Sequence, residues 1–234
     1  FAQMRQFSSD ASHELRTPLT VLKGQNELIL SKQRDPEEYQ EVIASNLEEI
    51  NYMSKVLEDL FILSKSDENQ IHLNCKRMDL RDLVEEVCKH AEVLAGDKDI
   101  HITIAFLESV TINGDEVRLR QMIWNILHNG IKYTQPGGEL KVSLQDEGEF
   151  ALLSIQDTGI GIPEKDLPLI FDRFYRVDKA RSRDEGGSGL GLSICKHIAE
   201  AHKGKVEVES KPSVGTRFKI RIPSITRAAN EQKL

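Results

Sequence analysis

A histidine with a carboxylate beside it and a proline shortly after it forms the first group of residues that could do chemistry. His13 and Glu14 are adjacent, and Pro18 follows in a stretch that otherwise reads as helix. A proline inside a helix crowds the carbonyl four residues back, here that of Glu14, and costs about 3 kcal/mol. Thr17 lies four residues from His13, on the same helix face. A neutral imidazole can act as a nucleophile, and the carboxylate could take its proton. The alternative is a surface histidine beside an ordinary kink.

Two glycine clusters favour a site for a phosphate group. The sequence DTGIGI (157–162) follows an apolar strand-like segment, and GGSGLGL (186–192) opens a predicted helix. Glycines at a helix start let backbone N–H groups approach phosphate oxygens, where the helix dipole also favours negative charge. Neither cluster is a Walker A or GxGxxG motif. One such cluster is more often a simple turn, but two of them, separated by a charged loop, favour a nucleotide site with a lid.

A predicted helix ending near residue 133 carries a third group of polar residues. Its members are three or four residues apart, roughly on one face: Asn125, Asn129, Lys132 and Tyr133. Amide oxygens suit Mg²⁺, which usually keeps several waters and binds jointly through the phosphates of a substrate. Lys132 can offset phosphate charge. The alternative is a solvated helix face, although asparagine is mildly unfavourable inside helices.

The elements that must position these residues are of two kinds. Residues 1–34 and 38–64 read as two helices joined by an acidic turn, and the second helix has apolar side chains at spacings of three and four. Two helices of this length bury little as a lone hairpin. We therefore expect a dimer that forms a four-helix bundle.

Beyond about residue 66 the pattern changes to short strands mixed with helices. We predict strands at 71–75, 99–106, 139–145, 150–156, 205–209 and 216–222, and helices at 80–94, 116–133, 164–170 and 190–202. This order favours a mixed sheet with helices over one face. The predicted domains are 1–66 and 67–234, with a mobile loop at 178–188 and a polar tail over the last ten residues.

Composition argues against several classes of function. The chain has 31 Lys plus Arg and 38 Asp plus Glu, a net charge of -7, whereas nucleic acids and anionic membrane surfaces need clustered positive charge. Three widely spaced cysteines form no CxxC motif and fit a reduced, cytoplasmic chain. No apolar run approaches the roughly 20 residues of a membrane span. Because the first residue is Phe1, we expect a piece of a longer protein.

Five motifs occur in the order found in bacterial sensor histidine kinases, and the chain resembles the cytoplasmic catalytic core of that family over about residues 1–223. SHELRTPL resembles the H box, WNILHNGIKYT the N box, DTGIGI the G1 box, FDRFYR the F box and GGSGLGL the G2 box. The resemblance implies a HisKA-type hairpin that forms a dimeric four-helix bundle, followed by an α/β sandwich of the Bergerat ATP-binding fold. One departure is Gly130, where the N box commonly has alanine; glycine there would weaken the helix by about 1 kcal/mol.

The same resemblance implies roles for individual residues. His13 matches the phosphorylated histidine, Glu14 the assisting base, and Thr17 the residue that positions water when such kinases act as phosphatases. Asn129 matches a Mg²⁺ ligand, and Asp157 matches the acceptor for the adenine amino group of ATP. The remaining matches surround the nucleotide or frame its lid: Asn125, Lys132, Tyr133, Gly159, Gly161, Arg176, Gly187, Gly189, Leu190 and Gly191. Arg176 is the one expected to reach the γ-phosphate.

The function implied is ATP-dependent autophosphorylation of His13, followed by transfer to an aspartate of a response-regulator receiver domain, with phosphatase activity toward that regulator. The implied full-length protein is a homodimer anchored in the inner membrane, with this part in the cytoplasm and in contact with neither membrane nor nucleic acid. Three alternatives stay open. A protein that acts mainly as a regulator phosphatase through Thr17 would share every residue with the kinase. An ATPase of the gyrase and Hsp90 superfamily would have a glutamate where this chain has Asn125, and a non-catalytic dimerisation scaffold would not need the nucleotide residues.

Overall fold

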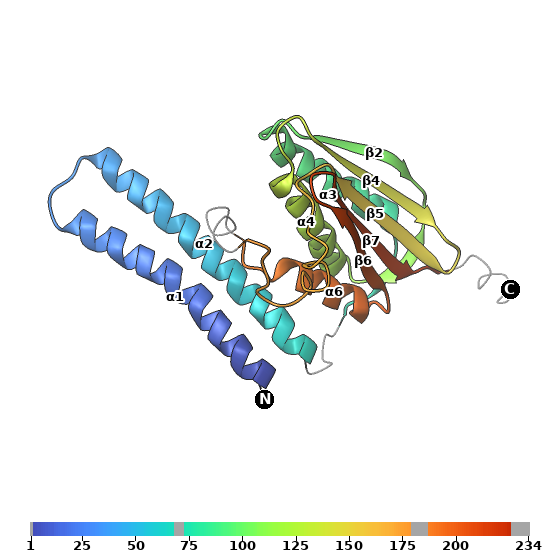
Figure 1. The fold of residues 1–234 in the computed structure, drawn as a ribbon, viewed down its shortest axis with the longest axis horizontal. Helices are drawn as coiled ribbons and strands as arrows, with labels where there is room; N and C mark the ends of the chain where they lie inside the picture. The colour runs from blue at the N-terminus through green and yellow to red at the C-terminus, as the bar shows by residue number, and fades with distance from the viewer. Residues whose placement is uncertain (1, 68–72, 179–186, 226–234) are drawn as a thin grey trace.

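A helical hairpin and an α/β domain make up the computed structural model, which describes residues 2–67, 73–178 and 187–225. The hairpin consists of α1 (Ala2–Leu30) and α2 (Pro36–Asp67), which run antiparallel beside the α/β domain (Figure 1). Most of the loop predicted at 178–188 and nearly all of the predicted polar tail lie outside the described residues.

The turn between the two helices is fixed by the residues that start α2. Pro36 occupies the first helical position, where its missing N–H costs no hydrogen bond. Glu38 accepts hydrogen bonds from the backbone N–H of Asp35 at 3.3 Å and from Nη1 of Arg34 at 2.9 Å. Acidic side chains in a first turn also interact favourably with the helix dipole. In α1, Pro18 lies within the helix and does not end it.

The α/β domain contains a five-stranded mixed sheet and a small two-stranded one. In the order β2-β4-β5-β7-β6, the large sheet comprises β2 (His101–Leu107), β4 (Glu139–Asp146), β5 (Phe150–Asp157), β7 (Gly215–Pro223) and β6 (Lys205–Lys211). Only the β2–β4 pair of this sheet is parallel. The small sheet pairs β1 (Lys76–Asp79) with β3 (Thr111–Gly114).

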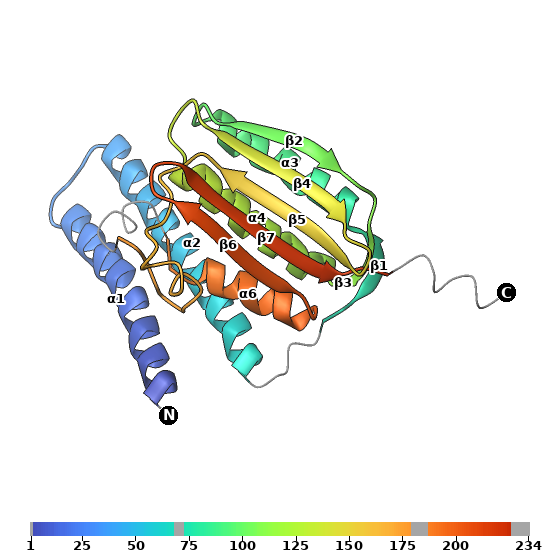
Figure 2. The same cartoon turned by 45° about the vertical axis from the view of Figure 1, so that its right-hand side comes forward.

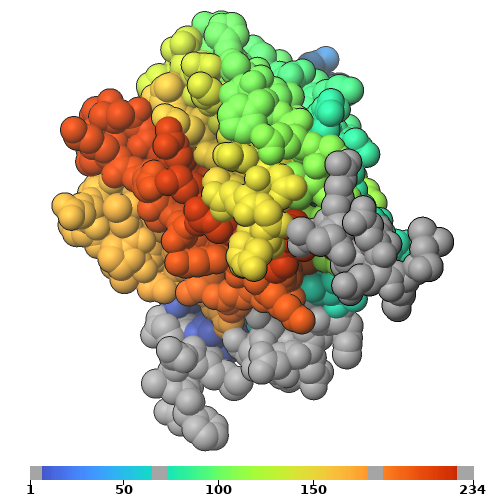
Figure 3. Space-filling model, turned by 90° about the vertical axis from the view of Figure 1, so that its right-hand side faces the viewer, coloured from blue at the N-terminus to red at the C-terminus, as the bar shows by residue number. Residues whose placement is uncertain are grey.

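Three helices cover one face of the large sheet: α3 (Leu80–Gly96), α4 (Glu116–Tyr133) and α6 (Gly191–Ala201) (Figure 2). The buried positions alternate along β5, as expected for a sheet with one covered face. In Figure 3, the side farthest from the hairpin shows a surface formed largely by strand segments. The mixed sheet with helices over one face, predicted from the sequence, is confirmed.

Buried and partly buried hydrogen bonds hold the start of α4, the helix that carries the polar residues predicted to bind nucleotide. Asp115 caps the helix by accepting from the N–H of Arg118 at 3.1 Å and also accepts from the N–H of Asn74 at 2.8 Å. Its own N–H donates to Nε2 of His202 at 2.9 Å. His202 thus joins the end of α6 to the start of α4.

Two predicted elements are wrong, and one strand of the structure was not predicted. The segment predicted as a strand at 71–75 has no strand over its described residues, and β1 begins at Lys76 instead. Residues 164–170 form consecutive turns rather than a helix, because Pro168 lacks an N–H and disfavours helix at the residue before it. Strand β3 was not predicted, because its Asn113-Gly114 pair is typical of a turn.

Candidate functional site

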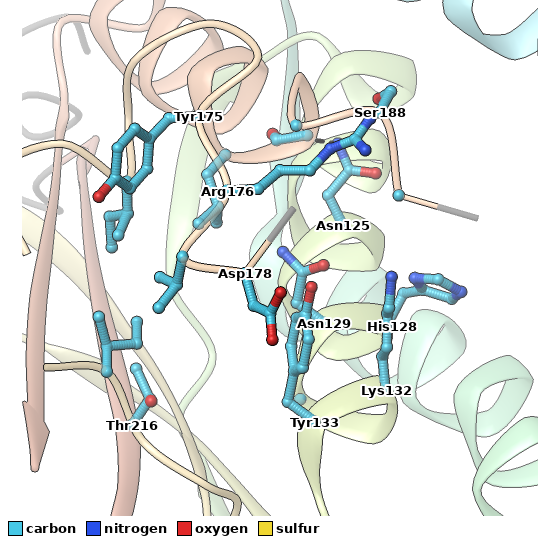
Figure 4. Close-up of a pocket in the computed structure, with 18 of the residues that line it drawn as sticks. Asn125, His128, Asn129, Lys132, Tyr133, Tyr175, Arg176, Asp178, Ser188 and Thr216 are labelled. Carbon is cyan, nitrogen blue, oxygen red and sulfur yellow. Dashed lines mark hydrogen bonds between the residues drawn. The ribbon is translucent and has the colours of Figure 1, made fainter. Parts of the chain in front are cut away.

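A cavity of about 420 Å³ is lined by residues of α2, α4, β5 and β7 and by segments within 160–163, 175–178 and 187–189. Figure 4 shows part of this lining. The size of the cavity suits a small-molecule ligand. Ten of the residues predicted to bind ATP line it: Asn125, Asn129, Lys132, Tyr133, Asp157, Gly161, Arg176, Gly187, Gly189 and Gly191. Gly159, Leu190 and the predicted residues of the H box are not among the residues that line it.

The polar side chains of α4 project into one wall of this cavity (Figure 4). Asn125 donates from Nδ2 to the carbonyl of Gly191 at 3.4 Å, which ties α4 to the start of α6. Nζ of Lys132 lies 5.2 Å from the ring centre of Tyr133. His128, not predicted, also lines the wall; burial first, and then nearby lysines, lower its pKa to about 4. His128 is therefore neutral at neutral pH and adds no charge to the wall.

Asp157 is buried at the end of β5 and lines the base of the cavity. Its Oδ1 accepts hydrogen bonds from the backbone N–H groups of Gly159 at 2.9 Å and Thr216 at 3.1 Å. Burial raises the pKa of this carboxyl, and the two backbone hydrogen bonds lower it. Both bonds use Oδ1, so in the described part of the chain they leave Oδ2 able to accept a further hydrogen bond.

Two glycines have backbone conformations that other residues rarely adopt, and both shape the cavity. Gly161 has φ +68°, and a Cβ there would lie 2.1 Å from the carbonyl oxygen of Lys211. Gly189 has φ +73°, and its Cβ would lie 2.8 Å from the backbone of Phe174, whose N–H donates to the Gly189 carbonyl at 3.0 Å. The G1 and G2 glycines therefore allow close backbone approach.

The predicted phosphoacceptor lies on α1, where its side chain is exposed to solvent. Thr17, one turn further, donates its hydroxyl to the His13 carbonyl at 3.3 Å. The ring of Pro18 is buried, so the proline faces the interior while His13 faces outward. A solvent-exposed imidazole is accessible to both a nucleotide and a partner protein.

Glu14 links the hairpin to the α/β domain. Its Oε2 accepts hydrogen bonds from the Tyr52 hydroxyl at 3.0 Å and from Nη2 of Arg176 at 2.7 Å. The Arg176 side chain is 7% exposed and that of Glu14 is 18% exposed, so water screens this ion pair only weakly. Arg176, predicted to reach a γ-phosphate, therefore also contacts the residue beside the phosphoacceptor.

An aromatic contact joins the two domains at a second point, also on α1. The Phe7 ring lies 6.0 Å from that of Phe174, and the Arg173 guanidinium lies 5.1 Å from the centre of the Phe7 ring. Phe174 has φ +62° and pairs with Gly189 at the base of the lid. The hairpin therefore contacts the F-box segment directly.

Residues of α2 complete the cavity, and the sequence did not predict them: Tyr52, Lys55, Val56 and Asp59. Asp59 is only 3% exposed, and burial, the largest influence, raises its pKa to about 6. The sequence spacing places these four residues close together on α2. It does not show which part of the α/β domain they contact, so their place in the cavity could not be predicted.

The donor set of the cavity bears on how a metal ion could bind. Among the described residues, no group of three histidine, cysteine or acidic side chains could hold a metal ion. Asn129 offers a neutral amide oxygen in the cavity wall near Lys132. This arrangement fits Mg²⁺ held jointly by one amide, waters and ligand phosphates.

Comparison with known families gives two matches, one in each half of the chain. Residues 3–69 match the His Kinase A (phospho-acceptor) domain, and residues 114–226 match the histidine kinase-, DNA gyrase B- and HSP90-like ATPase family. Across the helices that the structure describes, none is both long and apolar enough for a membrane span.

Named relatives and solved structures agree with these matches. Sensor histidine kinase CusS of Escherichia coli O157:H7 is 39% identical over 223 residues, which are 95% of this chain and 46% of CusS. ArlS of Staphylococcus epidermidis is 36% identical over 95% of this chain and 49% of its own. The chain thus spans about half the length of these curated relatives.

Among solved structures, the Acinetobacter baumannii histidine kinase AdeS has a TM-score of 0.72 at 28% identity, covering 90% of this chain and 97% of that one. Histidine kinase ThkA, in complex with response regulator protein TrrA, has a TM-score of 0.71 at 25% identity, covering 94% and 61%. The chain therefore belongs to the sensor histidine kinases and carries their phospho-acceptor and ATPase regions in that order.

Proposed function

We propose that this chain is a protein-histidine kinase that uses ATP and Mg²⁺ to phosphorylate His13 and then passes the phosphoryl group to an aspartate of a response regulator. One observation carries the proposal: Glu14, next to the exposed His13, contacts Arg176 in the wall of a cavity that ten of the twelve candidate nucleotide-binding residues line. The two parts are joined through the contact of Glu14 with Arg176. The proposed units are 1–66 for dimerisation and phosphoacceptance and 67–234 for ATP binding.

Positioning and charge neutralisation account for most of phosphoryl-transfer catalysis. Asp157 would accept from the adenine amino group and Lys132 would offset phosphate charge. Asn129 would hold Mg²⁺, which when bound neutralises charge on the phosphates. The imidazole of His13 would form the new nitrogen–phosphorus bond as the bond to the bridging oxygen breaks. Glu14 would accept the proton, and ADP would leave.

The rival ATPase function lacks a water-activating base at the expected place. Asn125 occupies that position, and its amide hydrogen-bonds the start of α6. An amide cannot accept a proton from water as a carboxylate does. A non-catalytic scaffold, another rival, gives no reason for ten candidate nucleotide residues to line one cavity.

The surface of the hairpin supports two proposed partners, a second copy of this chain and a response regulator. Apolar side chains along α2 are exposed, among them Ile43 and Leu47, which supports association with a second copy into a four-helix bundle. The complex of ThkA with TrrA supports a response regulator as a partner, and we propose that its receiver domain docks on the hairpin near His13. Thr17, exposed one turn from His13, would position water for the phosphatase reaction. We place this part of the protein in the cytoplasm and the full-length protein at the inner membrane.

Labelling with γ-³²P-ATP and Mg²⁺ tests the kinase reaction. We expect acid-labile, base-stable label on the chain that His13→Gln abolishes, because phosphohistidine has that stability. His90→Gln, at an exposed histidine on α3, is the matched control and should label normally. Label that survives His13→Gln would reject the assignment.

Asn129 is tested by binding rather than by activity. Asn129→Ala should weaken Mg²⁺-dependent nucleotide binding by about tenfold or more, which corresponds to about 1.4 kcal/mol. Calorimetric titration measures this directly, and Asn113→Ala, at an exposed residue of β3, serves as control. Unchanged affinity for Mg·ATP would remove Asn129 from the site.

A further inference from the structure

One oxygen atom of Glu14 accepts two hydrogen bonds from two different domains. The Tyr52 hydroxyl reaches Oε2 at 3.0 Å, and Nη2 of Arg176 reaches the same atom at 2.7 Å. A carboxylate oxygen that accepts from a guanidinium and a hydroxyl already has two donors on its lone pairs. In the arrangement seen here, Oε2 is therefore occupied.

The hydrogen bonds that Tyr52 and Arg176 donate to Glu14 differ in whether they depend on the position of the α/β domain. Tyr52 lies on α2, in the same hairpin as Glu14, so this bond remains when the α/β domain moves. Arg176 belongs to the other domain, so its bond lasts only while the domains are docked as here. The Nε of Arg176 is also buried without a hydrogen-bond partner among the described residues. A buried guanidinium with an unused donor, lining the nucleotide cavity, can exchange Glu14 for phosphate oxygens.

The Tyr52 hydroxyl has the properties of a constant donor. Burial first, and then the neighbouring Glu14 carboxylate, raise its pKa to about 12. Tyr52 is therefore protonated throughout the pH range in which a kinase works, and it can only donate to an ionised carboxylate.

We propose that Tyr52 is a positioning residue for Glu14: from within the hairpin its hydroxyl holds Oε2, so that Oε1 remains to take the imidazole proton once Arg176 has moved to the nucleotide. This inference rests on the proposed function. As the His13 nitrogen bonds to the γ-phosphorus and the bond to the bridging oxygen breaks, the proton from the other ring nitrogen passes to Oε1. ADP leaves with the electron pair of the broken bond, so atoms and charge balance.

Tyr52→Phe removes the hydroxyl and keeps the ring. We expect the kcat of autophosphorylation to fall about tenfold or more, the usual effect of losing a hydrogen bond to a charged group. The KM for ATP should stay within about twofold, because an interaction made to the base and not to the substrate affects the chemical step. Tyr39→Phe, at an exposed tyrosine of the same helix, is the matched control and should leave both constants unchanged.

A double variant separates positioning from a general structural effect. In a Glu14→Gln background, where the carboxylate base is absent, Tyr52→Phe should lower the residual kcat no further. A loss of packing or stability would instead lower kcat by the same factor in both backgrounds. Thermal unfolding of each variant shows directly whether the fold has weakened.

Each outcome decides between the possibilities. A fall in kcat at constant KM that disappears in the Glu14→Gln background supports the inference. Wild-type kcat in Tyr52→Phe, an equal fall in both backgrounds, or a change confined to KM would each overturn it. If the unaltered chain acquires no label, the proposed function itself fails; if it labels normally and Tyr52→Phe is silent, only the role of Tyr52 fails.

Discussion

The hairpin and the α/β domain differ in how far they bury the apolar side chains of their helices. On α2, Leu47 and Leu57 are each 54% exposed, whereas on α4 Ile126 and Leu127 are fully buried. Both helices are long and amphipathic, so the difference lies in what covers them. The α/β domain buries its helices against its own sheet. On α2, an apolar stripe that includes Ile43 and Leu47 stays exposed in the described part of this single chain. The domain has a complete core, and the hairpin has part of one.

This difference predicts different concentration dependences for the stabilities of the two parts. A domain with its own core unfolds at a midpoint independent of protein concentration, whereas a part completed by a second copy is stabilised by mass action. The proposed kinase thus combines a self-contained nucleotide-binding unit with a phosphoacceptor unit whose stability depends on association.

The largest effect is expected from a charged residue introduced into the apolar stripe of α2. Leu47→Asp would place a carboxylate in the dimer interface, and burying an unpaired charge costs several kcal/mol. We expect dimer dissociation constants to rise at least about 100-fold, or about 2.7 kcal/mol, as measured by sedimentation at micromolar concentration. Val117→Asp, at an exposed apolar residue of α4, is the control and should remain dimeric. A Leu47→Asp chain that dimerises normally would remove the stripe from the interface.

The next largest effect is expected from a cavity in the core of the α/β domain. Leu127→Ala should destabilise the α/β domain by about 2 to 5 kcal/mol, because a fully buried leucine is lost and a cavity forms. Calorimetry should show a lower unfolding midpoint for this domain, while sedimentation shows an unchanged dimer. A simultaneous loss of dimer would mean that the two parts do not fold independently.

A smaller effect concerns the surface where the two parts meet. Burial raises the pKa of Asp59 to about 6, above its ordinary value near 4, so the docked form binds more protons between these values. Docking should therefore strengthen as pH falls from about 6 to 4, and ionised Asp59 should oppose it at pH 7.5 by about 2 to 3 kcal/mol. Asp59→Asn should dock more tightly at pH 7.5 and lose this slope.

The fluorescence emission of Trp124 can measure this docking. Trp124 is the single tryptophan of the chain, and it lines a second cavity between α2 and α4 together with Asp59. His128, whose pKa is lowered to about 4, contributes a slope of opposite sign, since docking disfavours its protonation as pH falls from about 6.5. Subtracting the Asp59→Asn titration of tryptophan emission from that of the wild type cancels this contribution. Identical titrations would show that Asp59 does not sense docking.

The sequence predicted those features that depend on local pattern. The bounds predicted for α4 agree with the structure, and the one-sided mixed sheet is confirmed, because helix periodicity and strand alternation are local properties. The roles of individual site residues and the domain boundary at 66 stay predictions. The contribution of α2 to the cavity was not predicted, because the orientation of two domains depends on surfaces far apart in the chain.

Gly130 shows how a local rule can mislead. Glycine inside a helix predicts a weakness, but a Cβ at this position would lie 2.8 Å from Cδ2 of Leu140, a fully buried residue of β4. The missing side chain lets α4 pack closely on the sheet beside Asp157. Helix propensity alone contains no information about this neighbour.

The two contacts that α1 makes with the F-box segment have a mechanical consequence. Phe7 and Glu14 are seven residues apart, or about two turns, and so lie on the same side of the helix; one touches Phe174 and the other Arg176. A twist of α1 about its long axis would carry both away through nearly the same angle. Torque applied at the beginning of this helix would thus release the lid base and the guanidinium in a single movement, with no need for the hairpin to lengthen or bend.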